Sequence, residues 1–276
     1  MTIQTALRQG SRLLEEGAVP SPRLTAEILL CRALGCERTW LYSHSDEEVG
    51  ETAWIHYGRY LHERLQGKPT QYITRRQEFY GREFHVSPDV LIPRPETEHV
   101  VESALPVAAE ARRVVDVGTG SGAIAVSLAL ETRAEVWATD VSLEALAVAR
   151  ENARRLGADV RFVACDVTWS LGSSSMDLIV CNPPYVAFGE APGVQREVRD
   201  YEPRVAVFAG ETGLEVYERV VADAARVLRP GGWLVLELGF KSRDPVLALL
   251  GRRWTAIEVV PDLAGIPRVL RARLAS

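Results

Sequence analysis

The sequence Asn182-Pro183-Pro184-Tyr185 follows directly after residues 178–181, an apolar run typical of a buried strand. Because proline lacks a backbone N–H and has a fixed φ angle, the two prolines must end the strand in a rigid turn. The Asn182 side-chain oxygen and the Pro183 carbonyl oxygen can then accept hydrogen bonds from both N–H groups of a planar NH₂ group, against which the Tyr185 ring can lie. These contacts would orient a poorly nucleophilic nitrogen for a group-transfer reaction and stabilise its partly cationic transition state. Asn182, Pro183 and Tyr185 are therefore candidate catalytic residues, and with Pro184 they are candidate substrate-binding residues; a purely structural turn is the alternative.

A glycine-rich turn occupies the middle of VVDVGTGSGAIAVSLAL, residues 114–130, between a strand signal and a helix signal. Gly118, Gly120 and Gly122 allow the backbone to turn tightly and to approach a ligand closely, because they carry no Cβ atom. Their G-x-G-x-G spacing differs from the G-x-G-x-x-G fingerprint of folds that bind pyrophosphate dinucleotides. This spacing, with no basic residue inside the turn, differs from a diphosphate site, and a purely structural turn is the alternative to a ligand-binding one.

Three acidic residues end three successive strand signals. Asp140 lies where a carboxylate can accept hydrogen bonds from both hydroxyls of an adenosine ribose. Asp166 can receive an adenine amino hydrogen, and Asp116 can meet a cationic ammonium group directly or through the glycine turn. Three carboxylates suit a positively charged adenosine and suit a diphosphate badly, which favours S-adenosylmethionine as the cofactor over NAD.

Strand and helix signals alternate from residue 111 onward, which predicts an α/β fold with a mostly parallel sheet and helices on both faces. Ligands of such sheets bind at the carboxyl ends of the strands, where all of these motifs fall. We expect strands at residues 113–117, 135–139, 160–164, 178–181 and 233–238, helices at 122–130, 142–156 and 213–228, and a turn at 229–232.

The remainder of the chain reads as two further segments. Residues 1–68 carry several short amphipathic helix signals that end at glycines, which predicts a small helical domain. We expect this domain to take part in substrate recognition; a purely stabilising role is the alternative. Residues 69–98 are rich in aromatic and β-branched residues and in proline, which predicts a connecting β-hairpin and an extended linker. Residues 99–276 then form the α/β domain.

Composition excludes several classes of protein. The net charge of −5 argues against a large surface for nonspecific duplex binding. No apolar run approaches the roughly 18 residues of a membrane span, and the charged N-terminus lacks the apolar centre of a signal peptide, so we expect a cytoplasmic protein. The four cysteines have no zinc-binding spacing, and we expect no metal.

Three motifs together, GTGSG (118–122), ATD (138–140) and NPPY (182–185), resemble those of class I S-adenosylmethionine-dependent methyltransferases that act on planar NH₂ groups. Within that group, the chain is most similar to the release-factor glutamine methyltransferases, and the similarity covers nearly the whole chain. That family also carries a helical N-terminal domain and four further motifs, found here as FYGREFHVSPDVLIPRPETE (79–98), YEPRVAVFAGETGLEVYERVV (201–221), LELG (236–239) and DLAGIPRVLRARL (262–274).

The resemblance implies a Rossmann-like fold and methylation of the N5 amide nitrogen of the glutamine in the Gly-Gly-Gln motif of class I peptide chain release factors. It implies S-adenosylmethionine as the cofactor and release factors as the protein substrate; we expect no direct nucleic-acid partner, no membrane and a monomer. Residues that would hold the cofactor are Gly118, Thr119, Gly120, Ser121, Gly122, Asp140, Asp166, Val167 and Asn182, and the glutamine amide would be held by Asn182, Pro183, Pro184 and Tyr185. Two departures from the family pattern are the absence of a glutamine at residues 239–242 and Val167 where some members have an aromatic residue.

Two other functions share some of these features. An adenine-N6 nucleic-acid methyltransferase would use the same Asn-Pro-Pro-Tyr chemistry on a flipped base, but the acidic balance and the lack of a basic recognition domain oppose it. A noncatalytic binding module could keep the fold, but the intact Asn182 and the open glycine turn argue against that reading.

Overall fold

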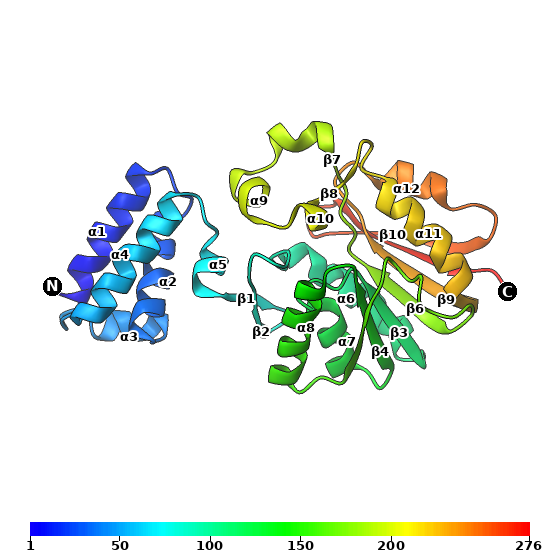
Figure 1. Cartoon of the computed structure of the whole chain (residues 1–276), viewed down its shortest axis with the longest axis horizontal. Coiled ribbons are helices and arrows are strands. Elements are labelled where there is room, and N and C mark those ends of the chain that lie inside the picture. The colour runs from blue at the N-terminus through cyan, green and yellow to red at the C-terminus, as the bar shows by residue number, and fades with distance from the viewer. The chain divides into compact units, whose positions relative to one another are not determined.

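Five helices build the first of two units in the computed structural model, which describes residues 1–276 (Figure 1). This unit spans Met1–Arg76 and has its own hydrophobic core, formed by residues from Ile3 to Ile73. It extends beyond residue 68 because Ile73 of the last helix packs into that core. The helices are α1 (Ile3–Glu16), α2 (Pro22–Leu34), α3 (Arg38–Ser43), α4 (Glu51–Leu65) and α5 (Thr70–Thr74).

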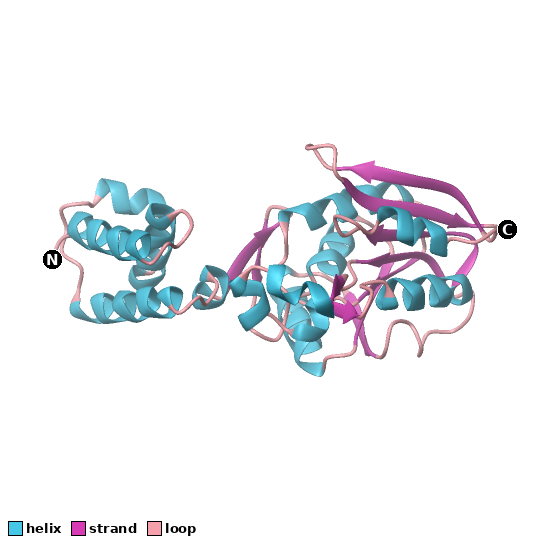
Figure 2. Cartoon of the chain, turned by 90° about the horizontal axis from the view of Figure 1, so that it is seen from above, coloured by secondary structure: helices cyan, strands magenta, loops and turns pink.

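A seven-stranded sheet is the centre of the second unit, Gln77–Ser276, and Figure 2 distinguishes its strands from the helices by colour. The strand order is β10-β11-β9-β6-β3-β4-β5. β11 runs antiparallel to β10 and β9, and all other neighbouring pairs are parallel. The expected α/β class with a mostly parallel sheet is thus confirmed. The strands are β3 (Arg113–Val117), β4 (Glu135–Asp140), β5 (Val160–Ala164), β6 (Met176–Cys181), β9 (Leu228–Glu237), β10 (Trp254–Pro261) and β11 (Pro267–Leu274).

Helices cover both faces of this sheet because successive strand residues alternate between two apolar layers. Val114 of β3 packs into the layer that includes α6 (Glu98–Ala108), α7 (Ala123–Glu131) and α8 (Leu143–Leu156). Val115 packs into the layer on the other face, with α11 (Glu215–Val227) and α12 (Arg243–Leu249) (Figure 1). The central strands are therefore buried on both sides.

Residues 229–232 were expected to form a turn, but they lie within β9 as a bulge. Met176 of β6 pairs with Leu228, and Leu178 pairs with Trp233, so several residues of β9 face a single residue of β6. Gly231 absorbs the distortion with a φ of 82°.

A hairpin and two connecting segments complete the second unit. The hairpin strands β1 (Arg76–Phe79) and β2 (Arg82–His85) bury Phe79 and Phe84 in the same core as α6 and α7. It is followed by the short helix η1 (Pro95–Thr97). Between β6 and α11 lie β7 (Val186–Ala187), η2 (Phe188–Gly193), α9 (Arg196–Tyr201), α10 (Arg204–Val207) and β8 (Phe208–Gly210). None of the helices is both long and apolar enough to cross a membrane.

Candidate active site

The site lies where the order of the strands reverses. From β3 the chain proceeds outward through β4 and β5, and it then returns to the other side of β3 with β6. Open α/β sheets bind ligands in the crevice outside the carboxyl ends of the two strands at such a switch point. Here Val117, the last residue of β3, pairs with Cys181, the last residue of β6. The glycine turn and the Asn-Pro-Pro-Tyr segment therefore begin side by side.

The glycine turn has the backbone that its sequence predicts. Gly118, Gly120 and Gly122 have φ angles of 70°, 54° and 83°, which lie in the left-handed region that glycine tolerates best. The backbone amide of Gly118 donates to the Thr139 carbonyl oxygen at 2.9 Å, which ties the turn to β4. A Cβ atom added at Gly118 or Gly120 would meet nothing within 4 Å, so both glycines border open space.

Asp140 holds the turn and the start of α8 together. One carboxylate oxygen, Oδ2, accepts a hydrogen bond from the Gly120 amide at 2.9 Å, and Oδ1 accepts one from the Ser142 amide at 2.9 Å. The carboxylate is half-buried, and each oxygen retains a lone pair. It is thus fixed in position and still able to accept hydrogen bonds from two ribose hydroxyls.

Asp116 lies beneath the turn and is almost completely buried. Its Oδ2 accepts hydrogen bonds from the Thr119 hydroxyl at 2.7 Å and from the Ala125 amide at 3.2 Å, whereas its Oδ1 is buried without a partner. Burial raises the pKa of the Asp116 carboxyl to about 7, although the two hydrogen bonds act in the opposite direction. An unpaired buried carboxylate oxygen beside an open glycine turn fits a ligand that carries a positive charge, as S-adenosylmethionine does.

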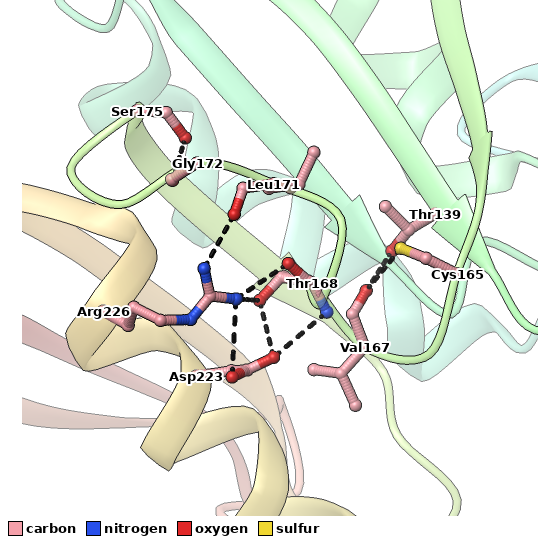
Figure 3. Close-up of polar contacts among 9 residues, drawn as sticks. All are labelled: Thr139, Cys165, Val167, Thr168, Leu171, Gly172, Ser175, Asp223 and Arg226. Carbon is pink, nitrogen blue, oxygen red and sulfur yellow. Dashed lines mark hydrogen bonds and ion pairs between the residues drawn. The ribbon is translucent and has the colours of Figure 1, made fainter.

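The loop that follows β5 forms a corner that two elements, β4 and α11, hold in place (Figure 3). Val167 has a φ of 50°, which is unfavourable for a β-branched residue. Its carbonyl oxygen accepts a hydrogen bond from the Thr139 hydroxyl of β4 at 2.8 Å. The Thr168 hydroxyl donates to Asp223 of α11 at 2.9 Å, and Arg226 of α11 donates to the Thr168 and Leu171 carbonyl oxygens at 2.9 and 2.7 Å.

Asp166 differs from the other two acids in its surroundings. Its side chain is exposed and forms an ion pair with Arg219 of α11. The contact of Asp166 and Val167 with an adenine ring stays a prediction.

In the Asn-Pro-Pro-Tyr segment, the Asn182 side chain is held by two successive hydrogen bonds. The Asn182 Nδ2 group donates to the Thr97 hydroxyl oxygen at 3.1 Å, and the Thr97 hydroxyl donates to Glu237 Oε2 at 2.6 Å. Thr97 ends η1, and Glu237 ends β9, so three separate segments meet at Asn182. The Asn182 Oδ1 atom accepts no hydrogen bond from the protein and is free to accept one from a substrate.

Tyr185 is packed between two glycines. A Cβ atom at Gly239 would lie 2.7 Å from the Tyr185 Cδ2 atom, and one at Gly213 would lie 2.7 Å from the Tyr185 carbonyl oxygen. Burial raises the pKa of Tyr185 to about 12, so the phenol is neutral. The ring can therefore present a flat, uncharged surface to a planar group.

Several residues of the site were not assigned a role from the sequence. Thr97 and Glu237 lie in motifs that the resemblance singled out, but they are 140 residues apart. A second such pair joins Arg94 to the buried Glu202, which also accepts a hydrogen bond from the Ile92 amide at 3.3 Å. Nothing local in the sequence indicates these partners, because the contacts join segments that are far apart in the sequence and meet only in the folded chain.

Comparison with solved structures agrees with this architecture. A methyltransferase from Pyrococcus furiosus is 20% identical, with a TM-score of 0.53 over 71% of this chain and 89% of that one. A 16S rRNA N2 G1207 methyltransferase from T. thermophilus is 24% identical, with a TM-score of 0.54 over 72% and 49% of the two chains. These two similarities show that the chain has a fold shared with methyltransferases.

Sequence relatives narrow the class. Residues 5–74 match the family described as PrmC N-terminal domain, and residues 97–197 match the methyltransferase small domain. The release factor glutamine methyltransferase of Koribacter versatilis is 47% identical over 99% of both chains. Those of Nitratidesulfovibrio vulgaris and Bacillus subtilis are 45% and 40% identical over 99% and 98% of this chain, and over 95% and 97% of their own. The chain belongs to the release factor glutamine methyltransferase family.

Proposed function

We propose that this enzyme transfers a methyl group from S-adenosylmethionine to the side-chain N5 nitrogen of the glutamine in the Gly-Gly-Gln motif of class I peptide chain release factors. The observation that carries the proposal is the state of Asn182, whose Nδ2 is engaged by Thr97 while its Oδ1 remains free beside the glycine turn. A free, fixed acceptor at this position suits an NH₂ group. The family's release-factor specificity then makes that group a glutamine amide.

The residues of the Asn-Pro-Pro-Tyr segment orient the glutamine amide and stabilise the transition state electrostatically. S-adenosylmethionine supplies an electrophilic methyl group on a sulfonium. Asn182 Oδ1 and the Pro183 carbonyl oxygen accept hydrogen bonds from the two N–H groups of the glutamine amide, which directs its nitrogen toward the methyl group. The same two oxygens stabilise the positive charge that develops on nitrogen during transfer. No side-chain base is required, because a protonated N-methyl amide is strongly acidic and loses its proton to water.

The cofactor side is proposed to use the residues named from the sequence. The amides of the turn 118–122 and Asp140 would hold the ribose and the amino acid tail, and Asp116 Oδ1 would face its ammonium group. Asp166 and Val167 would border the adenine. The geometric support is the fixed Asp140 carboxylate and the unpaired Asp116 oxygen.

We further propose that the helical unit Met1–Arg76 contributes to release-factor binding, since a glutamine on an exposed loop offers too little surface for specificity between proteins. The net charge of −5 supports a protein substrate and not a nucleic acid. Action in the cytoplasm as a monomer is part of the same proposal.

A methyl-transfer assay with labelled S-adenosylmethionine tests the substrate class. Purified release factor, the same factor with its Gly-Gly-Gln glutamine replaced by alanine, and adenine-containing DNA are offered separately. We expect label only in the unaltered release factor. Label in the DNA, and none in the release factor, would instead establish the adenine-N6 alternative.

A further inference from the structure

We infer that Thr97 and Glu237 are positioning residues that fix which end of the Asn182 carboxamide faces the substrate. The inference deepens the proposed function and rests on it, since it explains how Asn182 presents an acceptor and not a donor. The two side chains come from segments that are far apart in the sequence: Thr97 ends η1 and Glu237 ends β9.

A carboxamide presents its oxygen or its nitrogen to a given neighbour after a 180° rotation, and the two orientations have nearly the same shape. Only one orientation of Asn182 is productive. With Oδ1 toward the glutamine amide, it accepts an N–H hydrogen. With Nδ2 in that place, two N–H donors would face each other and would repel the substrate.

Thr97 distinguishes the two orientations because its hydroxyl has a single proton. That proton is given to Glu237 Oε2 at 2.6 Å, and an ionised carboxylate can only accept. The Thr97 oxygen is then left with lone pairs alone, and its other neighbour must be a donor. The neighbour is Asn182 Nδ2 at 3.1 Å, so the chain of hydrogen bonds runs in one direction from Asn182 through Thr97 to Glu237.

The burial of Thr97 and Glu237 makes a reversal of these hydrogen bonds energetically costly. Thr97 and Glu237 are each 4% exposed, so water cannot replace a lost partner. Tyr217 of α11 fixes the backbone around Glu237, because its hydroxyl donates to the Glu237 carbonyl oxygen at 2.8 Å and accepts from the Gly239 amide at 3.1 Å. An apolar pair would fill the same volume without the desolvation cost of a carboxylate, which points to a role beyond packing.

The protonation state of Glu237 controls which way the hydrogen bonds between Asn182, Thr97 and Glu237 run. Burial raises the pKa of the Glu237 carboxyl to about 7, and the charge of Glu96 raises it further; the hydrogen bond from Thr97 and the positive charges of Arg268 and Arg94 lower it. A protonated Glu237 can donate to the Thr97 oxygen, which frees the Thr97 proton for Asn182 Oδ1. The carboxamide would then be stabilised in its unproductive orientation.

Three variants test the chain of hydrogen bonds from Asn182 through Thr97 to Glu237, which we call the relay. Their kcat is measured at saturating cofactor, so that a change in cofactor affinity does not affect it. Thr97→Val removes the hydroxyl at nearly constant volume, and we expect kcat to fall roughly tenfold while the Kd for S-adenosylmethionine changes less than about twofold. Thr97→Ser restores the hydroxyl and should recover most of kcat. In the wild type kcat should rise with pH as Glu237 ionises near pH 7, and Glu237→Gln should lose that rise.

The matched control is Thr132→Val, which removes a hydroxyl of the same type that donates to the Leu128 carbonyl oxygen at the end of α7. It should leave kcat and its pH profile unchanged. The relay is refuted if Thr97→Val keeps wild-type kcat, or if Thr97→Ser and Thr97→Val lose kcat and cofactor affinity alike, as a merely structural role would predict.

A second readout needs no release factor. In the cofactor-bound protein, the side-chain NH₂ signal of Asn182, assigned by its loss in Asn182→Asp, should show one slowly exchanging proton in the wild type and in Thr97→Ser but not in Thr97→Val. If this pattern appears and no release factor is methylated, the relay stands and the proposed function fails. If release factor is methylated and the pattern is absent, the relay fails.

Discussion

Asn182 separates two hydrogen-bonding roles on a single carboxamide. Its nitrogen donates to the Thr97 hydroxyl oxygen, which holds the side chain in place, and its oxygen is the atom that we propose accepts from the substrate. The following prolines remove backbone flexibility at the same strand end. Most of the transition-state stabilisation is therefore assigned to preorganised oxygen atoms and very little to proton transfer.

Asn182→Ala should lower kcat for methyl transfer by about 100-fold or more, as expected for the loss of one preorganised polar group. The Kd for S-adenosylmethionine, measured by isothermal titration, should change far less than kcat, because the other residues proposed to hold the cofactor are unaltered. Unchanged turnover in this variant would remove Asn182 from the catalytic role given to it.

The buried Asp116 gives the free protein a distinctive dependence on pH. Its pKa is raised from an ordinary value of 3.8 to about 7, so between these values the folded state binds a proton that the unfolded state has lost. The stabilising contribution is complete below about pH 4, and it is lost as the pH rises through about 7. Asp116→Asn has no carboxyl group at this position to ionise, so we expect it not to lose this stability as the pH rises.

We therefore expect the difference in unfolding free energy, Asp116→Asn minus wild type, to increase between pH 4 and about pH 7 in cofactor-free protein, measured by urea denaturation. Asp200→Asn is the control of opposite sign, since hydrogen bonds from Arg199 and Arg196 lower the pKa of that exposed carboxyl. A difference for Asp116→Asn that does not vary with pH would show that Asp116 is ionised throughout.

At the scale of elements, α11 acts as a brace for the loop that follows β5. Asp223 and Arg226 hold Thr168 and the Leu171 carbonyl oxygen, and Thr139 of β4 holds Val167 (Figure 3). The strained φ of Val167 persists because these contacts determine it from two sides.

Arg226→Ala should weaken binding of S-adenosylmethionine roughly tenfold, because the loop relaxes and the corner that we propose borders the adenine is no longer preformed. The effect on kcat at saturating cofactor should be small. Arg154→Ala on the exposed face of α8, which removes only an ion pair with Glu151, is the matched control. Equal cofactor affinity in the two variants would exclude this role of α11.

Features that depend only on residues close together in the sequence could be predicted. The GTGSG turn and the proline-ended strand are local, so the spacing of Gly118 and Asp140 and the two prolines were sufficient to place them. Contacts between distant segments were not predictable, as the pairing of Thr97 with Glu237 and of Thr168 with Asp223 shows. The bulge around Gly231 was missed for a related reason, since it is defined by the register of β9 against β6.

At the scale of the whole molecule, the two units have separate hydrophobic cores, one within Met1–Arg76 and the others within Gln77–Ser276. The residues proposed to bind the cofactor and the glutamine all lie in the second unit. The helical unit can therefore serve substrate recognition without altering the chemistry.

Deletion of residues 1–76 should raise KM for the release factor at least about tenfold and change the Kd for S-adenosylmethionine little. The cut belongs after Arg76, because a cut after residue 68 would leave α5 without the core into which Ile73 packs. Equal weakening of both ligands would show that the helical unit only stabilises the second unit. Circular dichroism of the truncated chain verifies that it is folded.

Mass spectrometry of release-factor peptides, after incubation with the enzyme and S-adenosylmethionine, locates the transferred methyl group. We predict a gain of one methyl group on the glutamine of Gly-Gly-Gln, with fragment ions that place it on the side-chain amide, and no gain with Asn182→Ala over the same time. A methyl group on any other residue, or an unmodified glutamine with active wild-type enzyme, would contradict the assignment of the Asn-Pro-Pro-Tyr segment to a glutamine amide.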